Sequence, residues 1–168
     1  SGAALVLEVG RALSERPRPF TVWLVFLDAE AKTASAPVSA TRFRGSKQWA
    51  NLLEESNSLG RVRAIFYFDD VADPARPIAR DLNSHAAFRD VFFDTADELG
   101  HADIFPRVGH GRSLPGGHQV FLGRNMRRVV AISGVPRLGP DPSKPAGSTS
   151  SPSETLSAIG QVSVESID

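Results

Sequence analysis

Apolar residues recur at helical spacing near the start of the chain. Leu5, Val9 and Leu13 fall on one face of a helix, and Pro17 closes the pattern. This spacing predicts an amphipathic helix that packs against a sheet. The segment 20–27 that follows is apolar almost throughout and rich in β-branched and aromatic residues, which is typical of a strand covered on both faces. We expect it to be a central parallel strand.

A second strand follows the first through a helix. Residues 29–44 are small, polar and aperiodic, and Gly45-Ser46 then offers an N-cap for a helix that buries Trp49 and Leu53. Segment 61–68 begins by alternating and becomes fully apolar, as a buried strand does. A strand, a helix and a strand in this order predict a βαβ crossover, which is expected to be right-handed.

The clearest helical pattern in the chain begins after Ser84. The apolar residues of segment 88–99 follow the i, i+3, i+4 spacing, Ser84 is expected to cap the helix, and Gly100 stands at its end. A short apolar piece at 120–122 then precedes a third expected strand at 128–132. Alternating strands and helices predict an α/β domain with a three-layer αβα arrangement around a mostly parallel sheet.

The length of 168 residues and a hydrophobic content of 41% are those of a single domain with a real core. Segment 134–153 is rich in Pro, Gly and Ser, which predicts a long loop or a disordered stretch. Segment 154–168 is only weakly amphipathic. The chain opens at Ser1 without an initiator Met, so we expect residues 1–168 to be one incomplete domain whose N-terminal part is missing.

Charge and composition exclude several classes of function. Lys plus Arg and Asp plus Glu are 19 each, so no overall field attracts nucleic acid or anionic lipid, and the pair Arg127-Arg128 is interpreted as a solvated strand entrance. No apolar run approaches the roughly 18 residues of a membrane helix, which predicts a soluble protein. The chain has no cysteine, so any metal site must use His, Asp and Glu.

Acidic residues follow the ends of two expected strands. Asp28 and Glu30 come just after the first strand, and Asp69 and Asp70 end the second. In α/β sheets, ligands bind beyond the carboxyl ends of the strands. Acidic side chains gathered there repel one another unless a cation or a proton offsets the repulsion. The sequence therefore directs the search for a metal to this edge of the sheet.

Segment 20–30, which ends in Asp-Ala-Glu, resembles the strand and catalytic turn of the clan MH zinc metallopeptidases. This family contains aminopeptidases and glutaminyl-peptide cyclotransferases, and its turn reads Asp-Gly-Glu-Glu. Further matches occur in the order of the family's own motifs: Gly45-Ser46, Phe68-Asp69, Ile78 to Ser84, Gly116 to Leu122 (the family's Asp-Asp-His-Ile-Pro-Phe-Leu) and Ser150 to Ile167. The resemblance spans nearly the whole chain and implies a zinc-exopeptidase-like fold.

The resemblance also implies roles for three residues. Glu30 corresponds to the glutamate that transfers a proton, and His118 to a histidine that helps to hold the substrate. Asp69 corresponds to a carboxylate that binds a second metal or joins a hydrogen-bond network. Zinc is the cofactor of the family, in which it polarises a substrate carbonyl. The implied substrates or ligands are peptide or protein N-termini, and members of the family are often exported.

Several positions depart from the family pattern. Ala31 stands where the family has a zinc-ligating glutamate, Ser150 stands where it has the last histidine ligand, and Gly116 and Gly117 replace an acidic pair. The first histidine and the bridging aspartate would lie upstream of Ser1. Because a protein zinc site needs about three protein ligands, we expect this chain not to bind zinc tightly and to be catalytically impaired.

Each of these residues also has an ordinary structural interpretation. An acid such as Glu30 in a turn is usually solvated, Asp69 and Asp70 could simply form a turn, Asp28 could brace one, and His118 could be a buried, hydrogen-bonded histidine. Two functions therefore stay open: an impaired peptidase or cyclase, and a non-catalytic peptide-binding relative or truncated product that has lost the metal.

Overall fold

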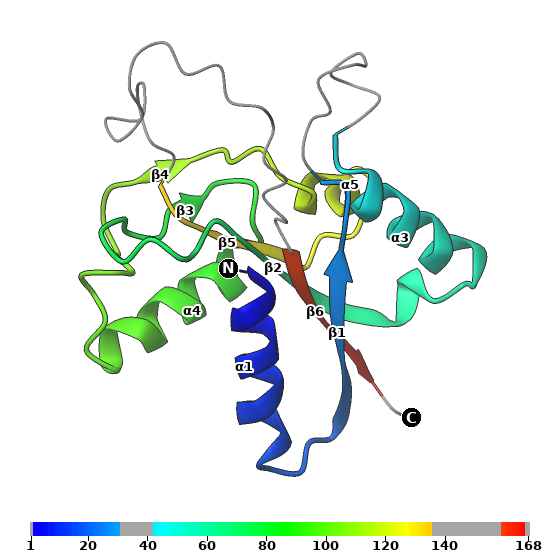
Figure 1. Cartoon of the computed structure of the whole chain (residues 1–168), viewed down its shortest axis with the longest axis horizontal. Coiled ribbons are helices and arrows are strands. Elements are labelled where there is room, and N and C mark those ends of the chain that lie inside the picture. The colour runs from blue at the N-terminus through cyan, green and yellow to red at the C-terminus, as the bar shows by residue number, and fades with distance from the viewer. Residues whose placement is uncertain (1, 31–41, 136–158, 167–168) are drawn as a thin grey trace.

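The computed structural model describes residues 2–30, 42–135 and 159–166 (Figure 1). In chain order the elements are α1 (Gly2–Ser14), β1 (Phe20–Leu27), α3 (Arg44–Glu55), the 3-10 helix η1 (Leu59–Arg61), β2 (Val62–Asp69), β3 (Arg80–Asp81), α4 (Ala86–Glu98), β4 (Gly111–Arg112), α5 (His118–Leu122), β5 (Val129–Ser133) and β6 (Ile159–Ser166). The expected helices and strands are present, apart from a different capping of α3 and α4 described below.

The main sheet has the strand order β1-β6-β2-β5. Strand β6 pairs antiparallel with both β1 and β2, and β2 pairs parallel with β5. Strands β1, β2 and β5 therefore run in one direction, which confirms a mostly parallel sheet. The prediction that β1 is a central parallel strand is wrong. It is the edge strand of the described sheet, and its neighbour is the antiparallel β6, because residues from the far end of the chain insert between β1 and β2.

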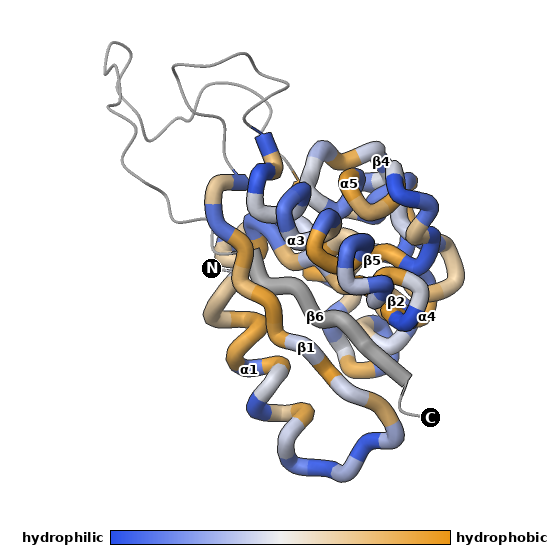
Figure 2. The backbone as a smooth tube through the Cα atoms, turned by 90° about the vertical axis from the view of Figure 1, so that its right-hand side faces the viewer, coloured by the Kyte–Doolittle hydropathy of each residue, from blue (hydrophilic) through white to orange (hydrophobic). Residues whose placement is uncertain are grey.

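Helices cover both faces of this sheet, as the three-layer prediction requires. On one face, Val6 of α1 and Phe93 of α4 share a buried cluster with Phe68 of β2. On the opposite face, Leu53 of α3 and Phe121 of α5 share a second cluster with the sheet. Figure 1 shows α1 and α4 on one side of the strands and α3 and α5 on the other. The tube in Figure 2 is orange along much of β1, the apolar strand of the sequence pattern.

Two helices begin differently from the sequence expectation. The N-cap residue of α3 is Phe43, which has a left-handed φ of 59°, and Ser46 lies inside the first turn. The N-cap residue of α4 is His85 rather than Ser84. The hydroxyl group of Ser84 instead donates to Asp81 at 2.7 Å and accepts the N–H of Ala131 at 2.8 Å. Both serines therefore bond to distant segments and do not cap their own helices.

The C-terminal part of the chain contributes a strand that the sequence did not predict. Strand β6 lies within the weakly amphipathic segment 154–168, and all eight of its residues pair with β1. Most of the Pro, Gly and Ser-rich segment 134–153 lies outside the described residues. That prediction therefore stays a prediction.

Candidate functional site

The residues expected to form a site meet at the carboxyl ends of β1 and β2. Glu30 lies three residues after β1, and Asp69 is the last residue of β2. His118 begins helix α5. The charges of Glu30 and His118 both influence the pKa of the Asp69 carboxyl. The three residues singled out from the sequence are therefore neighbours in the fold.

Glu30 is buried, with 5% of its surface exposed, and is not a solvated turn residue. Its Oε1 atom accepts a hydrogen bond from the backbone N–H of Ser46 at 2.6 Å, in the first turn of α3. Its Oε2 atom accepts the hydroxyl groups of Ser46 at 2.8 Å and of Tyr67 at 3.2 Å. The backbone carbonyl of Glu30 accepts the N–H of Phe43 at 3.2 Å, which ties the turn to the start of α3. The carboxylate is thus held by three donors.

Tyr67 belongs to this site, although the sequence analysis did not single it out. Its hydroxyl group accepts the N–H of Gly117 at 3.0 Å while donating to Glu30. Burial, followed by the nearby charges of Glu30 and Asp69, raises the pKa of Tyr67. A signal was available: this tyrosine is the only one in the chain, and it lies within an apolar strand where its hydroxyl group requires a partner.

The glycine pair that replaces the family's acidic pair packs directly against the other site residues. A Cβ atom at Gly117 would overlap the hydroxyl oxygen of Ser46 and would lie 2.5 Å from Oε2 of Glu30 and 2.7 Å from the Tyr67 hydroxyl oxygen. A Cβ atom at Gly116 would lie 2.6 Å from Nδ1 of His118. The described structure therefore has no room for a side chain at either position unless its neighbours move.

His118 is buried, with 1% of its surface exposed, and its ring lies 5.7 Å from that of Tyr67. Its Nε2 atom is 3.4 Å from Oδ2 of Asp81. Within the described part of the chain, neither ring nitrogen has a hydrogen bond of good geometry. The interpretation of His118 as a hydrogen-bonded core histidine is therefore only half right, because the ring is buried but its nearest polar contact among the described residues is this longer approach to Asp81.

Asp81 is a second residue that the sequence analysis did not single out. It is fully buried, and its carboxylate accepts the Ser84 hydroxyl group at 2.7 Å and the backbone N–H of Leu114 at 2.9 Å. Burial acts to raise the pKa of Asp81, but His118, Leu114 and Ser84 together outweigh burial and hold the pKa below its usual range. An ionised carboxylate therefore lies beside the His118 imidazole.

The remaining acids divide into one perturbed group and two structural ones. Burial raises the pKa of Asp69 most, and the charges of Asp70 and Glu30 raise it further. A hydrogen bond from the Asp70 backbone and the charge of His118 lower this pKa, but by less. Asp70 pairs with Arg76 through two contacts of 2.6 and 2.7 Å. Asp28 accepts the N–H of Ala29 at 2.6 Å and so braces the turn, as expected. Asp69 is therefore the acid at this edge that would gain most from a nearby cation.

The described residues do not fit a zinc ion. Among the side chains described in segments 2–30 and 42–135, no three of His, Asp or Glu are placed to hold a metal. Both oxygens of Glu30 already accept hydrogen bonds. The two positions at which the resemblance places lost ligands, Ala31 and Ser150, lie outside the described residues. The predicted loss of tight zinc binding therefore stays a prediction.

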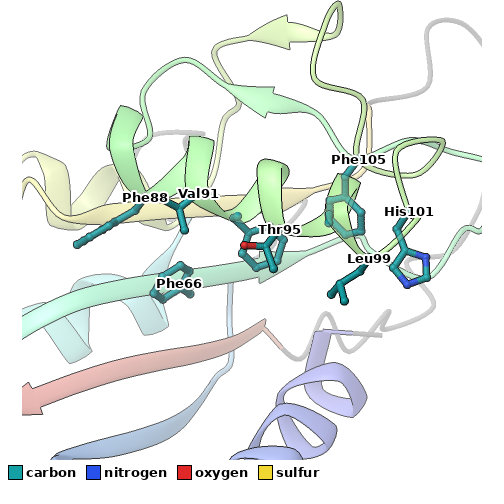
Figure 3. Close-up of a pocket in the computed structure, with 9 residues that line it drawn as sticks. Phe66, Phe88, Val91, Thr95, Leu99, His101 and Phe105 are labelled. Atoms are coloured by element: carbon teal, nitrogen blue, oxygen red, sulfur yellow. The ribbon is translucent and has the colours of Figure 1, made fainter.

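A separate apolar pocket of about 420 Å³ lies between α4 and β2. Figure 3 shows Phe66 of β2 and Phe88 towards one end of this pocket, and Phe105, Leu99 and His101 together at the other end. Its wall carries no carboxylate and only one titratable side chain. This pocket supplies no acid and base pair, so the candidate chemistry remains at the strand ends.

The fold is an α/β fold of the glutaminyl-cyclase-like type. The crystal structure of a glutaminyl cyclase from an Acidobacteriales bacterium matches this chain with a TM-score of 0.72 and 25% sequence identity. The match covers 93% of this chain and 52% of that chain, so the chain spans about half the length of the cyclase.

Searches of protein-family models and of curated proteins find no match. The structural match supports the cyclase side of the resemblance seen in the sequence. No helix in the described part of the chain is both long enough and apolar enough to span a bilayer.

Proposed function

We propose that this chain is part of a glutaminyl-cyclase or aminopeptidase type of domain that acts on peptide N-termini, and that it is catalytically impaired as it stands. The observation that carries the proposal is the buried Glu30 carboxylate just beyond β1, whose charge adds to burial and to the charge of Asp70 in raising the pKa of Asp69. A peptide amino group is a cation, and it would offset the repulsion between these two carboxylates.

In this proposal Glu30 exchanges a proton with the amino group of the substrate. An ionised carboxylate offers about four acceptor positions, and hydrogen bonds from Ser46 and Tyr67 occupy three of them. Room for one further contact remains at Oε1. Asp69 holds the ammonium charge, and His118 contacts the substrate beside Asp81.

Impaired turnover is the second part of the proposal. Gly117 packs against Glu30 where the family has an acidic side chain, and its N–H engages Tyr67. Ala31 cannot ligate a cation, and the residues described here lack a metal-binding cluster. The family's zinc would polarise the substrate carbonyl, and we derive no step through it in this chain.

The same contacts favour a second candidate, a non-catalytic domain that binds peptide N-termini. The tight packing of Gly117 against Ser46 and Glu30 would preserve the shape of the site after the loss of the metal. In that case Asp69 and Glu30 would still attract an ammonium group, but no bond would be broken. Binding without turnover distinguishes this candidate from the first.

Calorimetry on the purified chain tests both functions. A peptide with N-terminal glutamine should bind, an N-acetylated copy should not, and Glu30→Gln should weaken binding. The release of ammonia from the glutamine peptide reports cyclisation, and the release of the first residue reports peptidase activity. Equal affinity for the free and acetylated peptides would rule out recognition of N-termini.

Zinc titration tests the assignment of the lost ligands. The wild-type chain should bind zinc weakly, and the double substitution Ala31→Glu with Ser150→His should strengthen binding by at least about a hundredfold if each ligand is worth about 1.4 kcal/mol or more. Each single substitution is the matched control. Tight stoichiometric zinc in the unmodified chain would contradict the proposal of impairment.

A further inference from the structure

A pocket of about 610 Å³ lies at the amino ends of β2 and β5, away from the Glu30 site. Among the residues that the structure describes, its lining includes Arg124, Arg127, Arg128 and His85, and no acidic residue. Asp69 lies at the opposite end of strand β2, which is about 23 Å long at roughly 3.3 Å per residue. The pocket is therefore not part of the site proposed to act on peptides.

Two of these arginines are not neutralised by any side chain that the structure describes. Arg127 and Arg128 are exposed and have neither an ion pair nor a hydrogen bond from their side chains to any described residue. By contrast, Arg11, Arg76 and Arg107 each pair with two carboxylates. Arg127 and Arg128 line the same pocket, so their like charges disfavour each other, and an anion bound in the pocket would offset that cost.

The third arginine is fixed in place. Arg124 donates from Nε to Glu54 at 3.2 Å, from Nη1 to the Val120 carbonyl at 3.3 Å, and from Nη2 to the Asn51 side chain. Its charge is therefore partly offset, and it forms a fixed wall of the pocket. Recognition of an anion must depend mainly on Arg127 and Arg128.

The backbone that carries these arginines is held at several points. The N–H of Asn125 donates to Leu122 at 3.0 Å, and the N–H of Met126 donates to Phe121 at 3.1 Å. The carbonyl of Arg128 accepts the N–H of Ile65 at 2.9 Å, which ties it to β2. An anion would therefore bind to cations on an ordered backbone and would not have to order a loop.

His85 adds a polar atom without a partner to the same wall. Its Nδ1 atom is buried and has no hydrogen bond within the described residues, and its ring packs on Phe88 at 4.9 Å. His85 is also the N-cap residue of α4, where no side chain caps the helix. The positive end of the helix thus lies beside the two unpaired arginines.

We propose that this pocket binds a small oxyanion of the phosphate or sulfate class. The planar guanidinium groups of Arg127 and Arg128 match two edges of a tetrahedral dianion, each through paired N–H···O contacts. The ligand is either free phosphate or sulfate, or the phosphoryl group of a small molecule, since the pocket has room for more than the ion itself. The proposal is independent of any activity at Glu30.

The test titrates inorganic phosphate, sulfate and a simple phosphomonoester into the full chain at constant ionic strength. Backbone amide NMR should show saturable shifts at His85, Asn125 and Arg128. Substitution of both Arg127 and Arg128 by Ala should weaken binding by at least about tenfold, the effect of losing one charge-assisted contact of about 1.5 kcal/mol.

The matched control is the double substitution of Arg16 and Arg18 by Ala, which removes the same charge between α1 and β1. Binding of the phosphomonoester more tightly than the free ions would identify a phosphorylated small molecule as the source.

Two results would overturn the proposal. Equal weakening in the control would show that only net charge matters, and shifts identical to those caused by chloride would show that no site exists. Substitution of both arginines by Lys keeps the charge but removes the planar fork, so it should bind at an intermediate strength and should fold even if the Ala variant does not. Wild-type affinity in that Lys variant would contradict the paired guanidinium contacts.

Discussion

The hydroxyl group of Tyr67 lies 3.2 Å from Oε2 of Glu30 and joins the middle of β2 to the turn that follows β1. The same hydroxyl group accepts a hydrogen bond from the N–H of Gly117. Glu30 also accepts hydrogen bonds from the backbone N–H and from the hydroxyl group of Ser46. Four segments that are far apart in the sequence therefore meet at one carboxylate. The geometry of the candidate site depends on this contact, so its removal should affect stability and binding together.

Tyr67→Phe should destabilise the fold by about 1–3 kcal/mol, because it removes the acceptor of the buried Gly117 N–H and one donor to Glu30. Urea unfolding followed by tryptophan fluorescence measures the change. Thr21→Val is the control, since it also removes a hydroxyl group from a strand but breaks no hydrogen bond present among the described residues. Equal stability of the two variants would show that the Tyr67 contacts contribute little.

The stability of the protein should fall at alkaline pH because of the same residue. The pKa of Tyr67 is raised in the folded protein, while a tyrosine in the unfolded chain ionises near about pH 10. Its contribution to stability is therefore intact below about pH 10 and is lost as the pH rises toward the folded pKa. Because this is the only tyrosine, absorbance at tyrosinate wavelengths reports it alone. Ionisation near the ordinary pKa without loss of structure would contradict this prediction.

Local patterns were sufficient to predict the layers of the fold but not the position of every strand. The apolar run at 20–27 indicated a strand covered on both faces, and helices α1 and α3 do pack on its two sides. Its neighbour β6 comes from a segment with too few apolar residues to indicate a strand. Pairing between residues so far apart in the chain depends on the whole sheet, and no local spacing encodes it.

The site was predictable where acids follow strands, and less so where polar residues lie within buried elements. Glu30 and Asp69 were found from the positions at which the strands end, and His118 from the family resemblance. Asp81 and Tyr67 were missed because their partners, Leu114 and Gly117, lie on remote loops. Local patterns predict Ser46 and Ser84 as helix caps because capping is the local use of serine, whereas Ser46 bonds to Glu30 and Ser84 to Ala131, both distant in the sequence.

Gly117→Ala should destabilise the protein by about 1–3 kcal/mol through crowding. The backbone at Gly117 has a φ of −61°, which alanine adopts freely, so the expected cost comes only from contact of the new Cβ with Ser46, Glu30 and Tyr67. Gly60→Ala is the matched control, since a Cβ there meets nothing within 4 Å. Thermal unfolding of both variants measures the difference, and a Gly117→Ala protein as stable as the control would mean that the site opens easily.

Asp69→Asn should stabilise the protein near neutral pH. Because the pKa of Asp69 is raised, the folded state binds its proton more tightly than the unfolded chain, and stability falls as the pH rises from about 4 through the folded pKa. Asparagine is uncharged and removes this cost, so the advantage of the variant should shrink in acid.

Carbon NMR of the Asp69 carboxyl provides a second measurement: the pKa of Asp69 should fall in Glu30→Gln. An unchanged pKa in that variant would show that the two carboxylates do not interact.

Asp81→Asn should destabilise the protein by about 1–3 kcal/mol near neutral pH, because the new amide cannot accept from both the Ser84 hydroxyl group and the Leu114 N–H as the carboxylate does. It also leaves His118 without its negative neighbour. The pKa of Asp81 is lowered in the folded state, so its contribution is present above the unfolded value of about 3.9 and is lost as the pH falls through the folded pKa. The stability difference between wild type and variant should therefore narrow in acid.

Asp103→Asn, at an exposed position, is the control for loss of one charge. If both variants unfold at the same temperature near neutral pH, the buried Asp81 carboxylate does not stabilise the walls of the site, and the orientation of His118 must depend on packing alone.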